Sequence, residues 1–272
     1  MPFVTTQDGT RLFYKDWGSG SPVVLIHGWP LNSDMWEYNA RVLAEAGHRV
    51  IAYDRRGFGR SDQPWSGYDY DTLADDLGAV LDHTDISGAT LIGFSMGGGE
   101  VVRYLARHGD ARIAKIVLAA SVVPYLMKTP DNADGVDKSV FDGMVDGLKK
   151  DRPAFLAPFG KAFFGAGLLN FSVSSEMLQW SWSLALQGSP KATLDCVHAF
   201  AETDFRADCQ AVKVPTLIIH GDADQTVPVK ASSERAATMI AGAELIVYKG
   251  APHALVLTEA DRFNADVLRF IG

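Results

Sequence analysis

Cysteine is scarce in this chain, and its scarcity limits what the protein can be. Only Cys196 and Cys209 occur in 272 residues, so no disulfide framework supports the fold. Two isolated thiols are typical of a protein from a reducing compartment, and we expect a cytoplasmic location. A chain of this length buries roughly three quarters of the surface that its unfolded form exposes, so it needs neither disulfides nor a metal ion to hold a core.

Long hydrophobic runs and an excess of positive charge are also missing. The N-terminal segment carries Asp8 and Arg11 and shows no apolar signal core, and the longest uncharged stretch of an apolar region, 116–127, is shorter than the roughly 20 residues that a membrane helix needs. Asp and Glu outnumber Lys and Arg by 33 to 25, for a net charge of −8. An acidic chain repels phosphate backbones and anionic lipid headgroups, so we expect no nucleic acid and no membrane among its partners.

What the chain does contain is a series of short apolar segments without polar alternation. They lie at 23–26, 50–53, 90–92, 116–119, 216–219 and 245–248. Such segments are typical of strands buried on both faces, as in a parallel sheet covered by helices. Segments with helical spacing lie between them, at 35–45, 71–83, 101–107, 231–240 and 259–270. Together with a hairpin turn at Asp8-Gly9, this alternation predicts an α/β fold with a mostly parallel, doubly wound sheet.

The alternation of strand and helix breaks between Pro124 and Pro215. This stretch is rich in aromatic residues and has helical segments at 140–150, 174–186 and 193–199, but it has no clear buried strand. We expect residues 124–215 to form a helical cap inserted over one end of the sheet, and residues 1–123 and 216–272 to form the α/β core. The sequon Asn170-Phe171-Ser172 also lies here, and without a secretory context we interpret it as chance.

One motif carries nucleophilic chemistry. Gly93-Phe94-Ser95-Met96-Gly97 directly follows the segment 90–92 and opens a helix, which is the context in which G-x-S-x-G forms a sharp strand-to-helix turn. Such a turn exposes the Ser95 hydroxyl, and the flanking glycines leave room where a Cβ would clash. The Met96 backbone N–H points from the helix N-terminus toward any developing anion. We predict Ser95 as the nucleophile and Met96 as one oxyanion donor.

A serine hydroxyl needs a base, and the chain offers seven histidines. His253 is our candidate because it lies in the loop after the last strand, at the sheet edge that also carries Ser95. We interpret His27 and His220 as residues that fix turns at strand ends, and the remaining histidines as helix residues or residues near helix ends.

The acid that orients His253 should lie in the loop after 216–219, where Asp222 and Asp224 are both available. We favour Asp224, which lies further along the loop, and expect Asp222 to shape the turn through its side chain. The chain order Ser95, Asp224, His253 is that of the α/β hydrolases. The acid should hold the histidine tautomer and stabilise the imidazolium rather than accept its proton.

The loop after 23–26 is expected to complete the site. The backbone N–H of Trp29 is our second predicted oxyanion donor. Pro30 restricts Trp29 to an extended conformation, which would aim the Trp29 carbonyl in a fixed direction near the acyl group; an ordinary loop proline is the alternative. We expect no metal site. As candidates for the substrate pocket we name a mixed set from core and cap: Pro30, Phe94, Leu126, Phe200 and Val227.

Taken together, these motifs resemble the cofactor-free bacterial haloperoxidases, a group of α/β hydrolases that includes perhydrolases, aryl esterases and some lactamases. The segments that carry the resemblance are 15–18, 27–30, 53–62, 93–99, 220–224 and 251–253. The resemblance implies a triad of Ser95, Asp224 and His253, with Trp29 and Met96 as oxyanion donors. The Trp29-Pro30 pair is similar to that of members that make peracids. Ala254, where glycine is usual, and Leu255, where an aromatic is common, depart from the family pattern and leave the substrate preference open.

The resemblance also implies an acyl-enzyme cycle that needs no cofactor. The expected substrates are small esters, or short carboxylic acids together with hydrogen peroxide, which would yield peracids able to oxidise bromide or chloride. Because members of the group commonly form dimers, trimers or hexamers, we expect a homo-oligomer. An amidase or γ-lactamase of the same fold remains an alternative, and a non-catalytic ligand receptor is a more remote one.

Overall fold

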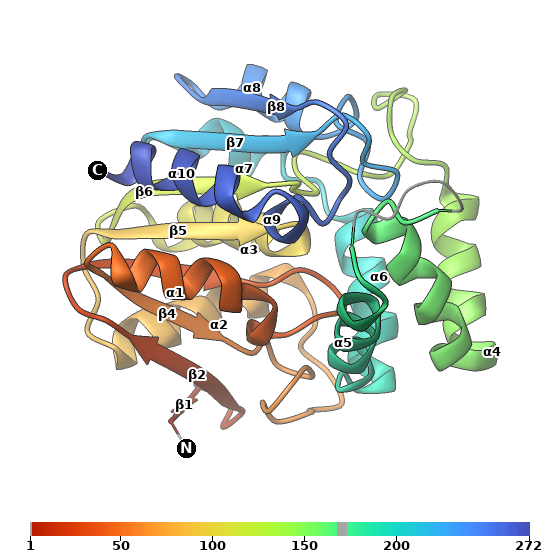
Figure 1. Cartoon of the computed structure of the whole chain (residues 1–272), viewed down its shortest axis with the longest axis horizontal. Helices are drawn as coiled ribbons and strands as arrows, with labels where there is room; N and C mark the ends of the chain where they lie inside the picture. The colour runs from red at the N-terminus through yellow and green to blue at the C-terminus, as the bar shows by residue number, and fades with distance from the viewer. Residues whose placement is uncertain (1, 168–172) are drawn as a thin grey trace.

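A computed structural model describes residues 2–167 and 173–272 of the chain, so the sequon at 170–172 lies outside the described residues. Within them, a single sheet has the strand order β1-β2-β4-β3-β5-β6-β7-β8 (Figure 1). The strands are β1 (Phe3–Thr5), β2 (Arg11–Trp17), β3 (Ser21–Ile26), β4 (His48–Tyr53), β5 (Ala89–Phe94), β6 (Ile113–Ala119), β7 (Thr216–Gly221) and β8 (Glu244–Tyr248). The β1–β2 and β2–β4 pairs are antiparallel, and all later pairs are parallel.

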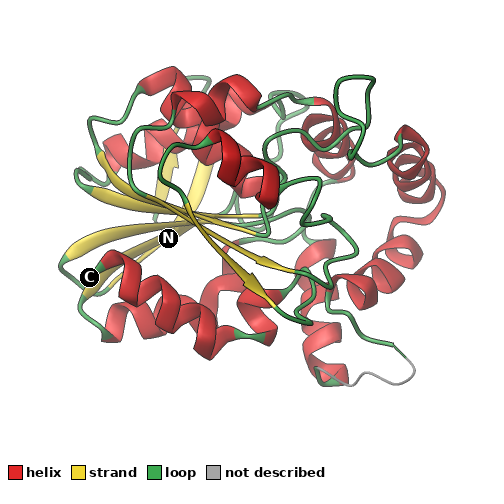
Figure 2. Cartoon of the chain, turned by 90° about the horizontal axis from the view of Figure 1, so that it is seen from above, coloured by secondary structure: helices red, strands yellow, loops and turns green. Residues whose placement is uncertain are grey.

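Helices cover both faces of this sheet (Figure 2). On one face α1 contacts α10, and on the other α2 packs against α3. The helices of the core are η1 (Ser33–Trp36), α1 (Glu37–Glu45), α2 (Tyr70–His83), α3 (Met96–His108), α8 (Ser233–Met239), α9 (Leu255–Thr258) and α10 (Ala260–Ile271). Asp69 begins α2 by accepting a hydrogen bond from the Thr72 N–H, as an N-cap should. The predicted α/β architecture is therefore confirmed.

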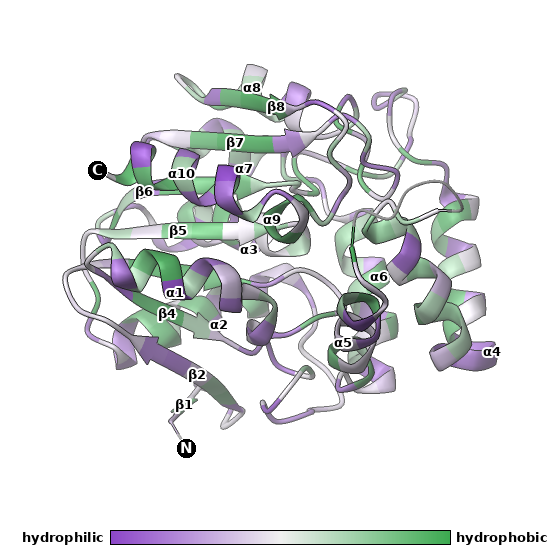
Figure 3. Ribbon diagram, in the orientation of Figure 1, coloured by the Kyte–Doolittle hydropathy of each residue, from purple (hydrophilic) through white to green (hydrophobic). Residues whose placement is uncertain are grey.

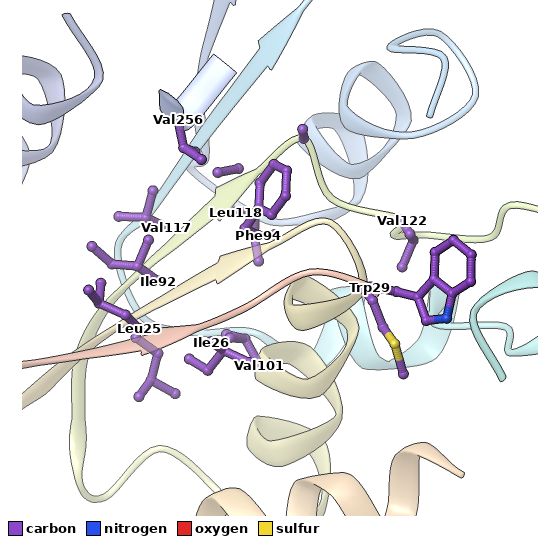
Figure 4. Packing of buried hydrophobic residues seen from close by; sticks show 14 of the residues in the cluster. Leu25, Ile26, Trp29, Ile92, Phe94, Val101, Val117, Leu118, Val122 and Val256 are labelled. Carbon is purple, nitrogen blue, oxygen red and sulfur yellow. The ribbon is translucent and has the colours of Figure 1, made fainter. Parts of the chain in front are cut away.

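The hydrophobic core follows directly from the apolar segments of the sequence. Every residue of β5 and the last four of β3 are buried. Green, hydrophobic stretches run along β7 and β8 in Figure 3 and also mark segments of the helices. Side chains of β3, β5 and β6 pack together in the layer drawn in Figure 4. None of the described helices is both long enough and apolar enough to cross a membrane.

Three further helices lie beyond the C-terminal ends of the strands (Figure 1). They are α4 (Lys138–Phe163), α5 (Ser175–Leu186) and α6 (Pro190–Glu202), and α4 packs against both of the others. The ribbon of α4 breaks at Asp151, whose backbone is not helical and whose carboxylate accepts a hydrogen bond from the Ala154 N–H. The helix expected at 140–150 therefore ends as predicted, and a second helical segment follows it to Phe163.

The last helix of the expected cap, α7 (Arg206–Ala211), packs differently from the other three. It contacts α3 and α8, which belong to the layers around the sheet. The helices that pack together beyond the sheet thus end with α6, before the boundary expected at 215.

Candidate active site

Ser95 lies in the sharp turn between β5 and α3, with φ 54° and ψ −117°. Left-handed backbone of this kind costs a non-glycine residue about 1–3 kcal/mol and persists only where its surroundings impose it. Here a Cβ on Gly93 would lie 2.6 Å from the Gly97 carbonyl oxygen, and one on Gly97 would lie 2.5 Å from that of Ile26. The two glycines of the motif therefore permit the close approach of strand and helix that forces Ser95 outward.

The structure brings Ser95, His253 and Asp224 together from three separate loops. His253 Nε2 lies 2.9 Å from Ser95 Oγ, and His253 Nδ1 lies 2.6 Å from Asp224 Oδ2. The three residues are 6%, 1% and 5% exposed, respectively. Because the ionised carboxylate only accepts hydrogen bonds, Nδ1 carries the hydrogen, and Nε2 is left to accept the serine proton.

The Asp224 carboxylate is surrounded by donors. Its Oδ1 accepts from the backbone N–H groups of Thr226 and Val227, each at 2.8 Å, and its Oδ2 contacts His220 Nε2 at 3.1 Å as well as His253. Burial on its own would raise the pKa of Asp224, but the His253 and His220 imidazoles outweigh it and hold that pKa well below its usual range. The carboxylate is thus kept ionised beside the base.

Asp222, the other acid of this loop, makes no hydrogen bond to His253 in the described part of the chain. Its Oδ1 accepts a hydrogen bond from the Gly250 N–H at 2.5 Å, which ties the β7 loop to the turn after β8. The side chain therefore shapes the turn, as expected from its place in the sequence.

The His253 ring is held between aromatic side chains. Its centroid lies 5.1 Å from that of Phe94 and 5.0 Å from that of Phe163, the last residue of α4. The Ala254 N–H also donates to the Phe163 carbonyl at 2.9 Å, so the loop of the base is tied directly to α4. Ala254 and Leu255, the two departures from the family pattern, are fully buried behind the histidine.

The two predicted oxyanion donors lie in the loop after β3 and at the start of α3. Neither the Trp29 nor the Met96 backbone N–H donates a hydrogen bond to another described residue. A Cβ on Gly28 would come within 3.1 Å of the Ser95 Cβ, which shows how closely the Trp29 loop approaches the serine. The Trp29-Pro30 peptide bond is cis, and the Trp29 indole N–H donates to the Thr193 carbonyl of α6 at 3.0 Å.

A buried ion pair lies beneath that loop, and sequence reasoning missed it. Arg55 Nε donates to Glu100 Oε1 at 2.5 Å, and its Nη2 donates to the His27 carbonyl at 2.6 Å. His27 Nε2 accepts from the Arg55 backbone N–H, so its hydrogen is on Nδ1, which donates to the Gly28 carbonyl at 2.9 Å. Burial, followed by the Arg55 charge, holds the pKa of His27 well below its usual value. His27 is therefore a neutral turn residue, as expected.

A small cavity opens above Ser95. It is narrow, with about 40 Å³ open to the centre of a water molecule. The site itself, the core loops and the 124–215 segment all contribute to its walls, which are Trp29, Ser95, Val122, Leu126, Val136, Val140, Phe141, Met144, Phe159, Phe200, Thr226, Val227 and His253. The expected pocket residues Leu126, Phe200 and Val227 are among them.

Two of the expected pocket residues do not line this cavity. Phe94 lies beneath the site, where its ring packs against His253 and Phe163, and Figure 4 shows it apart from Trp29 and Val122. Pro30 borders a separate and smaller cavity, and Phe159 lies in the walls of both. Neighbours of a functional residue in the sequence direct their side chains elsewhere, which is why Pro30 and Phe94 lie outside the walls of this cavity. Phe141, Met144 and Phe159 were missed because helical spacing alone does not tell a cavity wall from ordinary packing.

Other polar features of the molecule lie away from Ser95. A wider groove of 1170 Å³ runs along α2 and α3, but it contains none of the residues of the predicted chemistry. Asp71 and Asp75 of α2 form ion pairs with Arg103 and Arg107 of α3. Among the residues that the structure describes, no cluster of His, Cys, Asp and Glu is placed to hold a metal ion.

Fold and site together define a hydrolase with a serine nucleophile at the C-terminal edge of a mostly parallel sheet. Residues 21–260 match the alpha/beta hydrolase fold family, and the chain belongs to this family. It is 45% identical to a non-heme haloperoxidase of Rhodococcus erythropolis, over all of this chain and 99% of the relative. It is 42% identical to a bifunctional esterase/perhydrolase of Acinetobacter calcoaceticus, with the same coverage.

The solved structures agree with these sequence relatives. The crystal structure of a bromoperoxidase from Bacillus anthracis superposes with a TM-score of 0.96 at 46% identity, and the match covers 99% of each chain. The resemblance to the cofactor-free haloperoxidases, first noted from short motifs, is thereby confirmed over the whole length of the chain.

Proposed function

We propose that this chain is a serine hydrolase that cleaves small carboxylic esters through an acyl-enzyme, and that it forms peracids when hydrogen peroxide replaces water. The observation that carries the proposal is the hydrogen-bonded series from Ser95 through His253 to Asp224, at the floor of a small, mostly apolar cavity. The activities named for its relatives, haloperoxidase and esterase/perhydrolase, belong to this same chemistry.

In the proposed cycle, Ser95 Oγ attacks the ester carbonyl while His253 Nε2 takes its proton. The Trp29 and Met96 N–H groups receive the developing oxyanion, and Asp224 stabilises the imidazolium. His253 then gives the proton to the departing alcohol. Water, deprotonated by His253, attacks the acyl group and releases the carboxylic acid, which restores the Ser95 hydroxyl.

Perhydrolysis uses the same acyl-enzyme. One oxygen of hydrogen peroxide forms a bond to the acyl carbon, the bond to Ser95 Oγ breaks, and the peroxide proton reaches Oγ through His253. The product is a peroxycarboxylic acid, which oxidises bromide or chloride in solution. A short carboxylic acid enters the cycle by acylating Ser95 with loss of water. We propose that the Trp29-Pro30 pair favours peracid formation, since it orients the Trp29 backbone at the acyl group.

The cavity supports a short acyl group as the preferred substrate. A cavity this narrow favours a short acyl group such as acetyl or propionyl over a long chain. Much of its wall comes from Leu126, Phe141 and Phe200, so we propose that the 124–215 segment acts as a cap that selects the substrate. We also propose that the protein is a homo-oligomer. A cytoplasmic location is part of the proposal, because both cysteines are free thiols.

The test is replacement of Ser95 by alanine, with Ser183→Ala as the matched control because Ser183 is an exposed serine of α5. Hydrolysis of p-nitrophenyl acetate should disappear in the first variant and persist in the second, with folding intact in both. A phosphonate ester should modify the peptide that contains Ser95. Undiminished hydrolysis by Ser95→Ala would refute the proposal, and a lactam rate far above the ester rate would favour the lactamase alternative.

A further inference from the structure

A second histidine contacts the acid of the proposed triad. His220, at the end of β7, is fully buried, and its Nε2 lies 3.1 Å from Asp224 Oδ2 and 2.8 Å from the Val227 carbonyl. Its Nδ1 lies 2.6 Å from Ser233 Oγ, at the start of α8. His220 thus contacts the same carboxylate oxygen as His253, and it is not among the residues that line the cavity above Ser95.

The neighbours of His220 decide where its hydrogen lies. Both groups near Nε2, the Asp224 carboxylate and the Val227 carbonyl, only accept hydrogen bonds, so Nε2 must carry a hydrogen in either protonation state. Nδ1 faces a hydroxyl, and the Ser233 O–H can donate to it when the ring is neutral. His220 therefore shares its single Nε2–H between the nearer Val227 carbonyl and the Asp224 carboxylate, and it is not a second base.

We propose that His220 is a positioning residue of the catalytic site: its Nε2–H holds the Asp224 carboxylate toward His253 and supplies the fourth hydrogen bond that tempers its basicity. This inference rests on the proposed function, because it assigns Asp224 the role of triad acid. The inference gives His220 a role in the reaction, whereas its position at the end of a strand predicts only that it fixes a turn.

The same contact also pins the loop that carries the acid. Asp224 Oδ1 accepts the Val227 N–H, while the Val227 carbonyl accepts from His220, so the short loop is closed from both sides. Val227 lines the cavity. Loss of the His220 donor should therefore affect the orientation of the acid first and the cavity wall second.

The electrostatic consequence has a definite sign. The ionisable side chains that hydrogen-bond to Asp224 among the described residues are His253 and His220, and its remaining two donors are backbone N–H groups. His253 in turn faces Asp224, the Ser95 hydroxyl and the rings of Phe94 and Phe163. A carboxylate that loses one donor becomes a stronger base and stabilises the His253 imidazolium more. The acid limb of the kcat/KM profile should therefore move to higher pH.

Methionine and glutamine at position 220 form a matched pair of variants. The two side chains have the same length, but only glutamine offers an amide N–H near the place of the imidazole Nε2. For ester hydrolysis, we expect His220→Met to lower kcat about tenfold and to raise the acid-limb pKa by about one unit, the worth of one hydrogen bond to a charged group. His220→Gln should bring the acid limb back close to that of the wild type. Identical profiles for wild type and both variants would show that His220 is merely structural.

A measurement on the unmodified protein covers the case in which His220→Met does not fold. In ¹⁵N-histidine NMR spectra of the wild type at neutral pH, His220 should appear with its hydrogen on Nε2 and His253 with its hydrogen on Nδ1. A His220 ring whose Nε2 lacks a hydrogen would overturn the proposal. Failure of the proposed function has a separate signature, since Ser95→Ala would then keep its esterase activity whatever the state of His220.

Discussion

Replacing Arg55 by methionine should destabilise the protein in a way that depends on pH. The Arg55 guanidinium is buried between Glu100 and the His27 carbonyl and donates to both. Methionine fills much of the space of the arginine stem but offers neither charge nor donor. The Glu100 carboxylate would remain buried, with the Tyr53 hydroxyl, at 2.8 Å from Oε2, as its donor.

The expected loss at pH 8 is about 3–5 kcal/mol of the free energy of unfolding, because removing one partner of a buried ion pair leaves an uncompensated charge. Burial raises the pKa of Glu100 even though Arg55 lowers it, so losing Arg55 should raise it further. The pKa of the unfolded carboxyl stays near its usual value of about 4.3. The folded state then binds the proton more tightly, and the deficit shrinks as the pH falls, by at most about 1.4 kcal/mol per pH unit.

Urea unfolding followed by tryptophan fluorescence at pH 8 and pH 5.5 measures both quantities. The control is the double variant Arg55→Met/Glu100→Gln, which removes the buried charge as well. It should recover much of the lost stability and lose the added pH dependence. Equal destabilisation of the single and double variants at both pH values would refute the reasoning and assign the loss to packing.

Four other outcomes follow from the site and its surroundings. Asp224→Asn should lower kcat for p-nitrophenyl acetate about 10⁴-fold, because an amide favours the wrong His253 tautomer; a loss below tenfold would contradict the role of this acid. Pro30→Leu should lower the ratio of peracid formation to hydrolysis in paired assays, since the Trp29 backbone is less restricted, and an unchanged ratio would remove the idea. Phe141→Ala should enlarge the cavity and raise the kcat/KM of butyrate relative to acetate esters; an unaltered ratio would mean that Phe141 does not limit chain length. Burial raises the pKa of the Cys196 and Cys209 thiols to about 12, so a disulfide reagent at pH 8 should label neither cysteine before denaturation, and rapid labelling of the native protein would disprove their burial.

The sheet could be predicted from the sequence because its central strands are buried on both faces, which leaves continuous apolar segments. Helical spacing becomes visible only from residue 101, although α3 begins at Met96 as the G-x-S-x-G motif predicts, because Gly97-Gly98-Gly99 has low helix propensity. Packing overrides that propensity here. A Cβ on Gly99 would lie 2.5 Å from the Tyr70 ring, and one on Gly98 would lie 2.0 Å from Ser121 Oγ. These glycines are needed inside the helix for close contact, which no local pattern reveals.

The proposed catalytic residues and their supports differ in how far the sequence could reveal them. Ser95 and His253 follow strands whose C-terminal ends share one edge, so topology alone predicts that they lie close together. Arg55 and Glu100 meet only after β4 and α3 pack, and nothing in their own segments indicates the partner. The contact between His220 and Asp224 likewise forms only because the loop after β7 turns back and brings these two residues, four positions apart, into contact. Pairings of this kind follow from the tertiary fold and not from spacing.

In the proposed mechanism, chemistry and substrate choice come from different parts of the molecule, and Phe163 links the two parts. The proposed triad, Ser95, His253 and Asp224, lies in loops that follow strands of the sheet and is joined by hydrogen bonds. Phe141 and Met144, in the first half of α4, instead form part of the cavity wall. The last turn of α4 contacts His253 through the Phe163 ring and holds Ala254 through the Phe163 carbonyl. Substitutions in the first half of α4 should therefore change which ester is preferred. Substitutions at its end should change kcat for all esters alike, because they move the base and leave the wall in place.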